Sequence, residues 1–114
     1  MDSLHNSDLV RGHIDTFILR VLKDGDNYGY QIIKEIALRS GNRFELKEPT
    51  LYSSLRRLEK QKFITSYWGE ETQGGRRKYY TLTVSGHDRF IQNWNEWKAA
   101  REIIDVLIGW GKEH

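Results

Sequence analysis

The sequence feature that most constrains the fold is a helical segment followed directly by two short β-prone segments. Pro49 suits the first turn of a helix, and Leu51, Leu55 and Leu58 follow at the spacing of one narrow apolar stripe. The segments FITSYW (63–68) and RKYYTL (77–82) then favour strands, and three glycines lie between them. This order predicts a helix packed against a β-hairpin with a long, flexible tip.

Two further helices are expected before this unit. Ser7 and Asp8 can cap the first, because apolar residues recur at helical spacing over residues 10–22. Asn27 can cap the second, and Gly41 suits the left-handed position that follows a helix.

The remaining segments complete the order of elements. Phe44 and Leu46 alternate with charged residues, so a short strand is possible there. Thr83 can cap a last, long helix. Three helices, a hairpin and a helix predict a mainly α fold with a small β-hairpin. We expect a winged helix-turn-helix over residues 8–83 and a C-terminal dimerisation helix over residues 84–110.

The composition limits the class of protein. The chain has 114 residues and no cysteine, which fits one small domain of a cytoplasmic protein without disulfides or cysteine zinc sites. We expect neither a membrane span nor a signal peptide. The net charge is +2, but residues 47–82 alone carry eight basic and four acidic residues. This local excess favours a nucleic-acid partner, although a solvated basic surface is the simpler alternative.

The predicted helix that begins near Pro49 has an outer side suited to DNA. Opposite its leucines lie small, hydroxyl-bearing and basic side chains, without an acidic residue at the centre. These are Pro49, Ser53, Arg56 and Lys60, flanked by Thr50 and Arg57 on one side and by Tyr52 on the other. A recognition helix needs this pattern, but an ordinary amphipathic helix with a solvated basic face also has it.

The predicted hairpin tip strengthens the DNA interpretation. Gly74 and Gly75 precede three consecutive cations, Arg76, Arg77 and Lys78. Glycine lets a backbone approach a phosphate chain closely, and cations gain affinity by releasing counterions from DNA. We therefore expect a wing that lies along the DNA backbone or the minor groove, and a plain flexible loop is the alternative.

The C-terminal helix carries more apolar surface than one small domain can cover, which usually marks an interface. We expect a two-fold homodimer in which this helix packs on its mate and on the mate's first helix, and such symmetry suits an inverted-repeat operator. Two of its tryptophans share a side, where they can pack in the dimer or line a pocket for planar ligands. The large apolar residues are Trp94, Trp97, Ile103, Ile104, Leu107 and Trp110.

Several segments resemble the PadR family of bacterial regulators over roughly residues 8–110. They are DGDNYGYQI, EPTLYSSLRRLEKQKFI and YWGEETQGGRRKYYTLTVSGH. The short terminal helix is similar to that of the small members, which include a multidrug-binding branch. The resemblance implies a homodimer that represses a transporter or detoxification operon and is released by a small molecule.

The resemblance also implies site residues. Those for DNA are Thr50, Tyr52, Ser53, Arg56, Gly75, Arg76, Arg77 and Lys78. Those for a planar aromatic ligand between subunits are Trp97, Trp94, Leu9, Asp15, Thr16 and Arg101. Arg101 is basic where the multidrug-binding branch tends to be acidic, and Asp15 can offset it. A pocket here is expected to accept neutral or anionic aromatic compounds at least as well as cationic ones.

An enzyme is not expected, because no cysteine is present and no serine or aspartate stands with a histidine in a recognisable catalytic arrangement. The pairs His13–Asp15 and His87–Asp88 offer too few ligands for a metal, and no cofactor is expected. Two alternatives stay open. One is a winged-helix module that binds protein rather than DNA, and the other is a regulator that responds to phenolic acids rather than to many drugs.

Overall fold

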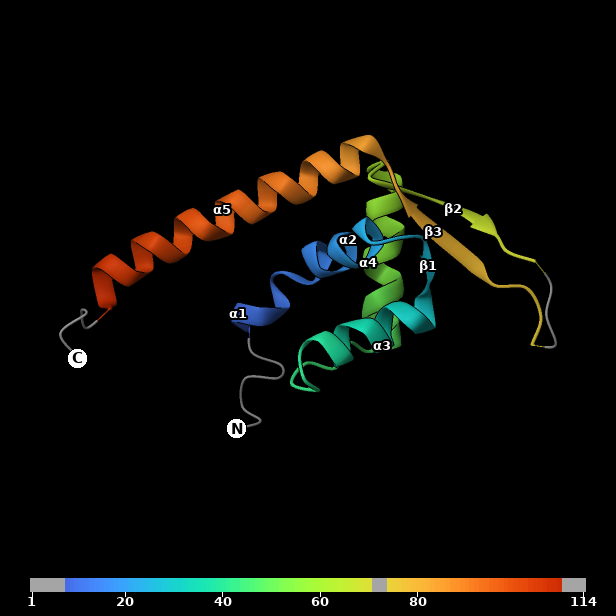
Figure 1. Ribbon diagram of the computed structural model, residues 1–114, viewed down its shortest axis with the longest axis horizontal. Helices are drawn as coiled ribbons and strands as arrows, with labels where there is room; N and C mark the ends of the chain where they lie inside the picture. The colour runs from blue at the N-terminus through green and yellow to red at the C-terminus, as the bar shows by residue number, and fades with distance from the viewer. Residues whose placement is uncertain (1–7, 71–73, 110–114) are drawn as a thin grey trace.

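The computed structural model describes residues 8–70 and 74–109, which form five helices and three strands. These elements are α1 (Asp8–Arg11), α2 (Ile14–Lys23), β1 (Asn27–Tyr28), α3 (Gly29–Arg39), α4 (Glu48–Lys60), β2 (Ile64–Trp68), β3 (Lys78–Leu82) and α5 (Val84–Ile108). Helices α1–α4 lie together, the β2–β3 hairpin projects from one end, and α5 runs away toward the other (Figure 1). The predicted mainly α fold with a hairpin and a long terminal helix is confirmed.

The core lies where α2, α3 and α4 meet the sheet. The predicted leucine stripe of α4 is buried, with exposed fractions of 0% for Leu51, 1% for Leu55 and 2% for Leu58. These side chains pack in one cluster with Ile18 of α2 and Ile32 of α3. Burial of each such side chain contributes about 1.5–3 kcal/mol, so this cluster fixes α4 within the domain.

The first helix differs from the prediction because it is interrupted. A turn at Gly12 and His13 separates α1 from α2, and the His13 amide donates to the carbonyl of Val10 at 3.0 Å. Glycine has low helix propensity, which accounts for a break at this point. The predicted cap Ser7 lies outside the described residues, as do Gln73 and Trp110.

The prediction that Asn27 caps a helix is wrong. Asn27 lies in β1, where it pairs with Tyr80 of β3, and its side-chain oxygen accepts from the Tyr28 amide at 3.0 Å. The N-cap position of α3 belongs to Tyr28, which makes no side-chain cap bond. The chain therefore gains a third antiparallel strand, in the order β1-β3-β2, and the predicted hairpin becomes part of a small sheet.

The possible strand around Phe44 and Leu46 is also absent from the structure. Both side chains are buried, and the intervening Glu45 is exposed. The backbone forms no strand there. The alternation in sequence therefore reflects alternate burial in an extended connection, where the two side chains complete the core, and not pairing with a neighbouring strand.

The predicted cap at Thr83 is confirmed, and it joins α5 firmly to the end of α4. The Thr83 hydroxyl accepts from the Gly86 amide at 3.0 Å and lies 2.9 Å from the Lys62 carbonyl. Ser85 donates to the same carbonyl at 3.0 Å. A β-carbon at Gly86 would overlap the Phe63 carbonyl oxygen, so the helix passes as close as glycine permits. The direction of α5 is therefore set by the turn that follows α4.

Two further predicted boundaries agree with the structure. Pro49 lies in the first turn of α4, and Gly41 follows α3 with φ +66°, the left-handed conformation expected after a helix. No helix within residues 8–70 and 74–109 is both long and apolar enough to cross a membrane.

Candidate DNA-binding surface and ligand groove

The outer side of α4 presents the residues that the sequence placed there. Ser53 and Arg56 are exposed, Tyr52 is 39% exposed, and Thr50 is half-buried. Tyr52 is not free on all sides, because a β-carbon at Gly29 would overlap its hydroxyl oxygen. The start of α3 thus supports the Tyr52 ring beside the N-terminal half of α4.

Arg57 follows Arg56 in sequence, but its side chain binds α2 instead of staying on the outer side of α4. Its Nε and Nη2 donate to the two carboxylate oxygens of Asp15 in α2, at 3.1 and 2.7 Å. Nη2 also donates to Ser54 Oγ at 3.1 Å. The hydrogen bond to Asp15 raises the pKa of the Arg57 guanidinium above its ordinary value. Arg57 thus joins α4 to α2, whereas Arg56 stays on the outer side.

The wing has two faces, and one of them contacts α4. Strand register pairs Ser66 with Tyr80 and Trp68 with Lys78, so these four side chains share a face. Ser66 donates to the carboxylate of Glu59 in α4 at 2.6 Å. Burial, with added repulsion from Glu59 and Tyr52, raises the pKa of Tyr80, and Arg56 opposes the rise. We call this surface the α4-facing side of the wing.

The three predicted wing cations are exposed, and each lies over an aromatic ring. The Arg76 guanidinium is 5.6 Å from the Trp68 ring centroid, and Lys78 Nζ is 6.0 Å from the same ring. Arg77 is 4.7 Å from the Tyr28 ring on the opposite side. Gly75 has φ +93°, a conformation that favours glycine at this turn. Sequence reasoning missed Trp68 and Tyr28, although pairing the two predicted strands would have placed Trp68 beside Lys78.

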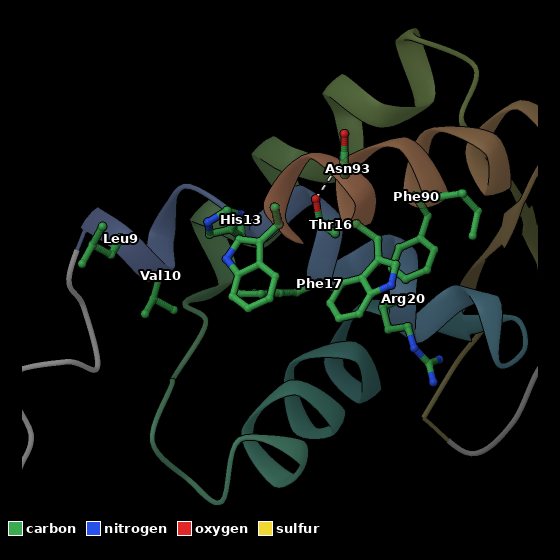
Figure 2. Close-up of a pocket in the computed structure, with 11 residues that line it drawn as sticks. Leu9, Val10, His13, Thr16, Phe17, Arg20, Phe90 and Asn93 are labelled. Atoms are coloured by element: carbon green, nitrogen blue, oxygen red, sulfur yellow. Dashed lines mark hydrogen bonds between the residues drawn. The ribbon is translucent and has the colours of Figure 1, made fainter. Parts of the chain in front are cut away.

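A groove of about 750 Å³ lies between α1–α2 and α5 (Figure 2). Four of the predicted ligand residues line it, namely Leu9, Thr16, Trp94 and Trp97. The other two, Asp15 and Arg101, line an adjoining hollow that shares Leu9, Thr16 and Trp97 with the groove. Residues that the prediction missed also line the groove. Among them, Phe90 could have been predicted, because it lies one helical turn before Trp94 and so on the same side of the helix. The missed residues are Val10, His13, Phe17, Arg20, Phe90, Ile91 and Asn93.

Within this α2–α5 groove, the two tryptophans are stacked on each other. Their ring centroids lie 5.7 Å apart with an angle of 11° between the planes. Arg101 lies 5.6 Å from the Trp97 ring, and Lys98 lies 5.2 Å from the Trp94 ring. Such contacts give both indoles a cationic neighbour. Asn93, which is also on α5, donates from Nδ2 to Thr16 Oγ1 at 2.9 Å and so ties α5 to α2.

Asp15 was expected to offset the charge of Arg101, but in the structure each of the two pairs with another residue. Asp15 is bound to Arg57, and Arg101 lies 3.9 Å from Asp105 on its own helix. Among the described residues that line the groove itself, none is acidic, and Arg20 is bound to Asp24 at 2.7 Å. That hydrogen bond lowers the pKa of Asp24. The part of the chain that the structure describes contains no group of three potential metal ligands.

Comparison with known proteins identifies the family of this chain. Residues 18–92 match the transcriptional regulator PadR-like family. An uncharacterized protein of Lysinibacillus sphaericus is 44% identical over 102 residues, which is 90% of this chain and 94% of that protein.

Solved structures give the same result. A transcriptional regulator of Clostridium thermocellum shares 43% identity with a TM-score of 0.83, over 90% of this chain and 97% of that one. A PadR family transcription regulator of Clostridium difficile shares 39% identity with a TM-score of 0.75, over 86% of this chain and 100% of that one. Proteins of this kind are DNA-binding transcriptional regulators and not enzymes. The chain belongs to the PadR-like family of transcriptional regulators.

Proposed function

We propose that this protein is a homodimeric repressor that binds an inverted-repeat operator in double-stranded DNA. The observation that carries the proposal is the exposure of basic side chains on both the outer side of α4 and the wing. Ser53 and Arg56 can reach base edges from α4, and Arg76, Arg77 and Lys78 can neutralise phosphates from the wing. Thr50, Tyr52 and Gly75 complete the proposed contact set.

The proposed dimer would cover the apolar surface of α5. Ile104 is 49% exposed and Leu107 is 76% exposed, and the end of this helix extends past the other elements (Figure 1). A second copy supplies the same surface through a two-fold axis, as well as the first helix of the partner. Two reading heads at a fixed spacing then match an inverted repeat.

We further propose that a planar aromatic molecule in the α2–α5 groove releases the protein from DNA. The lining is largely apolar and contains the stacked pair Trp94–Trp97. No carboxylate lines the groove in the described chain, and Arg101 already lies over Trp97. Both features favour neutral or anionic aromatic ligands, including phenolic acids, over cationic ones. The regulated genes are expected to encode a transporter or a detoxification enzyme.

The DNA proposal is tested by fluorescence anisotropy with a duplex from the region upstream of the protein's own gene. Binding is expected to weaken steeply as KCl rises, because phosphate contacts release counterions. A mixed-sequence duplex of the same length is the control and is expected to bind more weakly. Absent or salt-insensitive binding would contradict the proposal and favour a module that binds protein.

The ligand proposal is tested by tryptophan fluorescence with two probes that share one ring system, 2-naphthoate and 2-naphthylmethylammonium. Use of the Trp68→Phe variant removes the wing indole from the signal. We expect quenching by naphthoate at least as strong as by the ammonium compound, and its loss in Trp97→Ala. Quenching by neither probe, nor by uncharged naphthalene, would contradict the ligand site.

A further inference from the structure

Trp68 is a large aromatic residue that the fold leaves in solvent. It ends β2 and is 56% exposed, although it shares a face with the buried Ile64. The alternation along β2 places Ile64, Ser66 and Trp68 on the α4-facing side of the wing. Trp68 therefore lies beyond the core on the same side as the outer surface of α4, with no packing role that accounts for its size.

The surroundings of Trp68 are cationic. Lys78 pairs with it across the strands, and both Lys78 and Arg76 lie over its ring. An exposed ring next to two cations complements a sugar–phosphate chain, whose deoxyribose is apolar and whose phosphates are anionic. A ring that holds cations in place also lowers the side-chain entropy lost when they bind phosphate.

We propose that Trp68 is a DNA-contacting residue of the wing, whose indole packs against the sugar–phosphate backbone and positions Arg76 and Lys78 toward the phosphates. The inference rests on DNA binding by this family and adds a residue outside the predicted set. It also divides the wing cations, because Arg76 and Lys78 act on the α4-facing side with Trp68.

The opposite face of the wing differs in a way that provides a control. Tyr67 is 44% exposed, but its ring is stacked on Tyr79 at 5.7 Å and its hydroxyl donates to Asp26 at 2.7 Å. That hydrogen bond raises the pKa of Tyr67. Arg77 is held over Tyr28 on this face. An aromatic residue adjacent to Trp68, similarly exposed but beside a carboxylate, is not suited to face phosphates.

The experiment measures anisotropy of a labelled mixed-sequence duplex of about 30 base pairs, long enough for two recognition helices one turn apart. Trp68→Ala is expected to weaken binding about 10-fold, and to lower the slope of log K against log [KCl] by about one unit as the cations lose their support. Trp68→Phe keeps a ring and is expected to stay within about threefold of wild type. Tyr67→Ala is expected to stay within about twofold.

A double-mutant cycle separates positioning from folding. If Trp68 positions Arg76, then Trp68→Ala and Arg76→Ala together weaken binding less than the product of the single effects. Circular dichroism melts identify a variant that fails to fold. If Trp68→Ala does not fold, Trp68→Phe and Arg76→Ala carry the test, and the loss of affinity is expected to be larger in Arg76→Ala than in Trp68→Phe. Wild-type affinity in folded Trp68→Ala, or an equal loss in Tyr67→Ala, would overturn the inference. Failure of the wild-type protein to bind any duplex would instead overturn the proposed function.

Discussion

Helices α4 and α5 both carry many apolar side chains, but the leucines of α4 are buried and the apolar side chains of α5 are largely exposed. In α4 the stripe is buried, and Leu55 is only 1% exposed. In α5 only Gly86 is buried among the described residues, and Leu107 is 76% exposed. The stripe of α4 finds its partners in α2, α3 and the sheet. The apolar surface of α5 stays largely exposed among the described residues, and this exposure is the basis of the proposed dimer.

The two helices also differ in how many faces are apolar. The side chains of α4 divide into one buried side and one exposed side, which is how a helix on a single core behaves. In α5, Phe90 and Trp94 face the α2–α5 groove, while Ile103 and Leu107 lie beyond the reach of the domain. Apolar residues on several faces fit the proposal that a second copy packs on this helix.

The largest expected effect is on the buried stripe. Leu55→Ala removes a fully packed side chain, so the free energy of unfolding should fall by about 3 kcal/mol. Urea unfolding followed by circular dichroism measures this change. The loss should be the same at low and high protein concentration once dissociation is accounted for, since the contacts lie within one chain. A loss below about 1 kcal/mol would show that α4 is not fixed by this core.

A charge placed among the exposed apolar residues of α5 should affect the dimer rather than the core. Leu107→Glu places a carboxylate on the proposed interface, and we expect the dimer dissociation constant to rise by about 30-fold or more, equivalent to about 2 kcal/mol. Sedimentation velocity over a dilution series measures it. Val84→Glu is the matched control, because Val84 is equally exposed on the same helix but lies at its first turn. An unchanged dissociation constant for Leu107→Glu would remove this end of α5 from the dimer.

A substitution where α5 joins the turn after α4 is expected to have an effect of similar size. In Gly86→Ala the new methyl group meets the Phe63 carbonyl, which belongs to backbone and cannot move alone. We expect the free energy of unfolding to fall by about 2 kcal/mol. Gly74→Ala is the control, because a β-carbon there meets no atom within 4 Å. If the two variants melted at the same temperature, α5 would not be anchored as closely as the structure places it.

Sequence reasoning found the fold where one local pattern decides the structure. The spacing of Leu51, Leu55 and Leu58 is enough to predict an amphipathic helix, and Thr83 directly after the strand is enough to predict a cap. Sequence reasoning was wrong where a contact between distant parts of the chain decides the structure. Asn27 has the chemistry of a cap, but its backbone pairs with Tyr80, far along the chain. Phe44 and Leu46 alternate like a strand, but no neighbouring strand is present to pair with them.

The candidate sites were predictable to a similar degree. Helical spacing located Trp94 and Trp97 on one side, and the stacked rings confirm that they share it. The partner of each charge was not predictable, because Asp15 and Arg57 are 42 residues apart and meet only in the fold. Helical spacing placed Arg56 on the outer side and Arg57 on its flank, but it could not supply the Asp15 carboxylate that binds Arg57.

The smallest expected effect concerns these two arginines and sharpens the division of α4 into a buried and an exposed side. Arg56→Ala removes a cation from the outer side, and operator binding should weaken by about 10-fold. Arg57→Ala removes a cation already bound to Asp15, so binding should stay within about threefold. The free energy of unfolding should fall by about 0.5 kcal/mol, because the ion pair is half exposed and screened by water. Anisotropy and urea unfolding of the two variants measure both quantities. If Arg57→Ala weakened DNA binding as much as Arg56→Ala, then Asp15 must release Arg57 to the DNA when the complex forms.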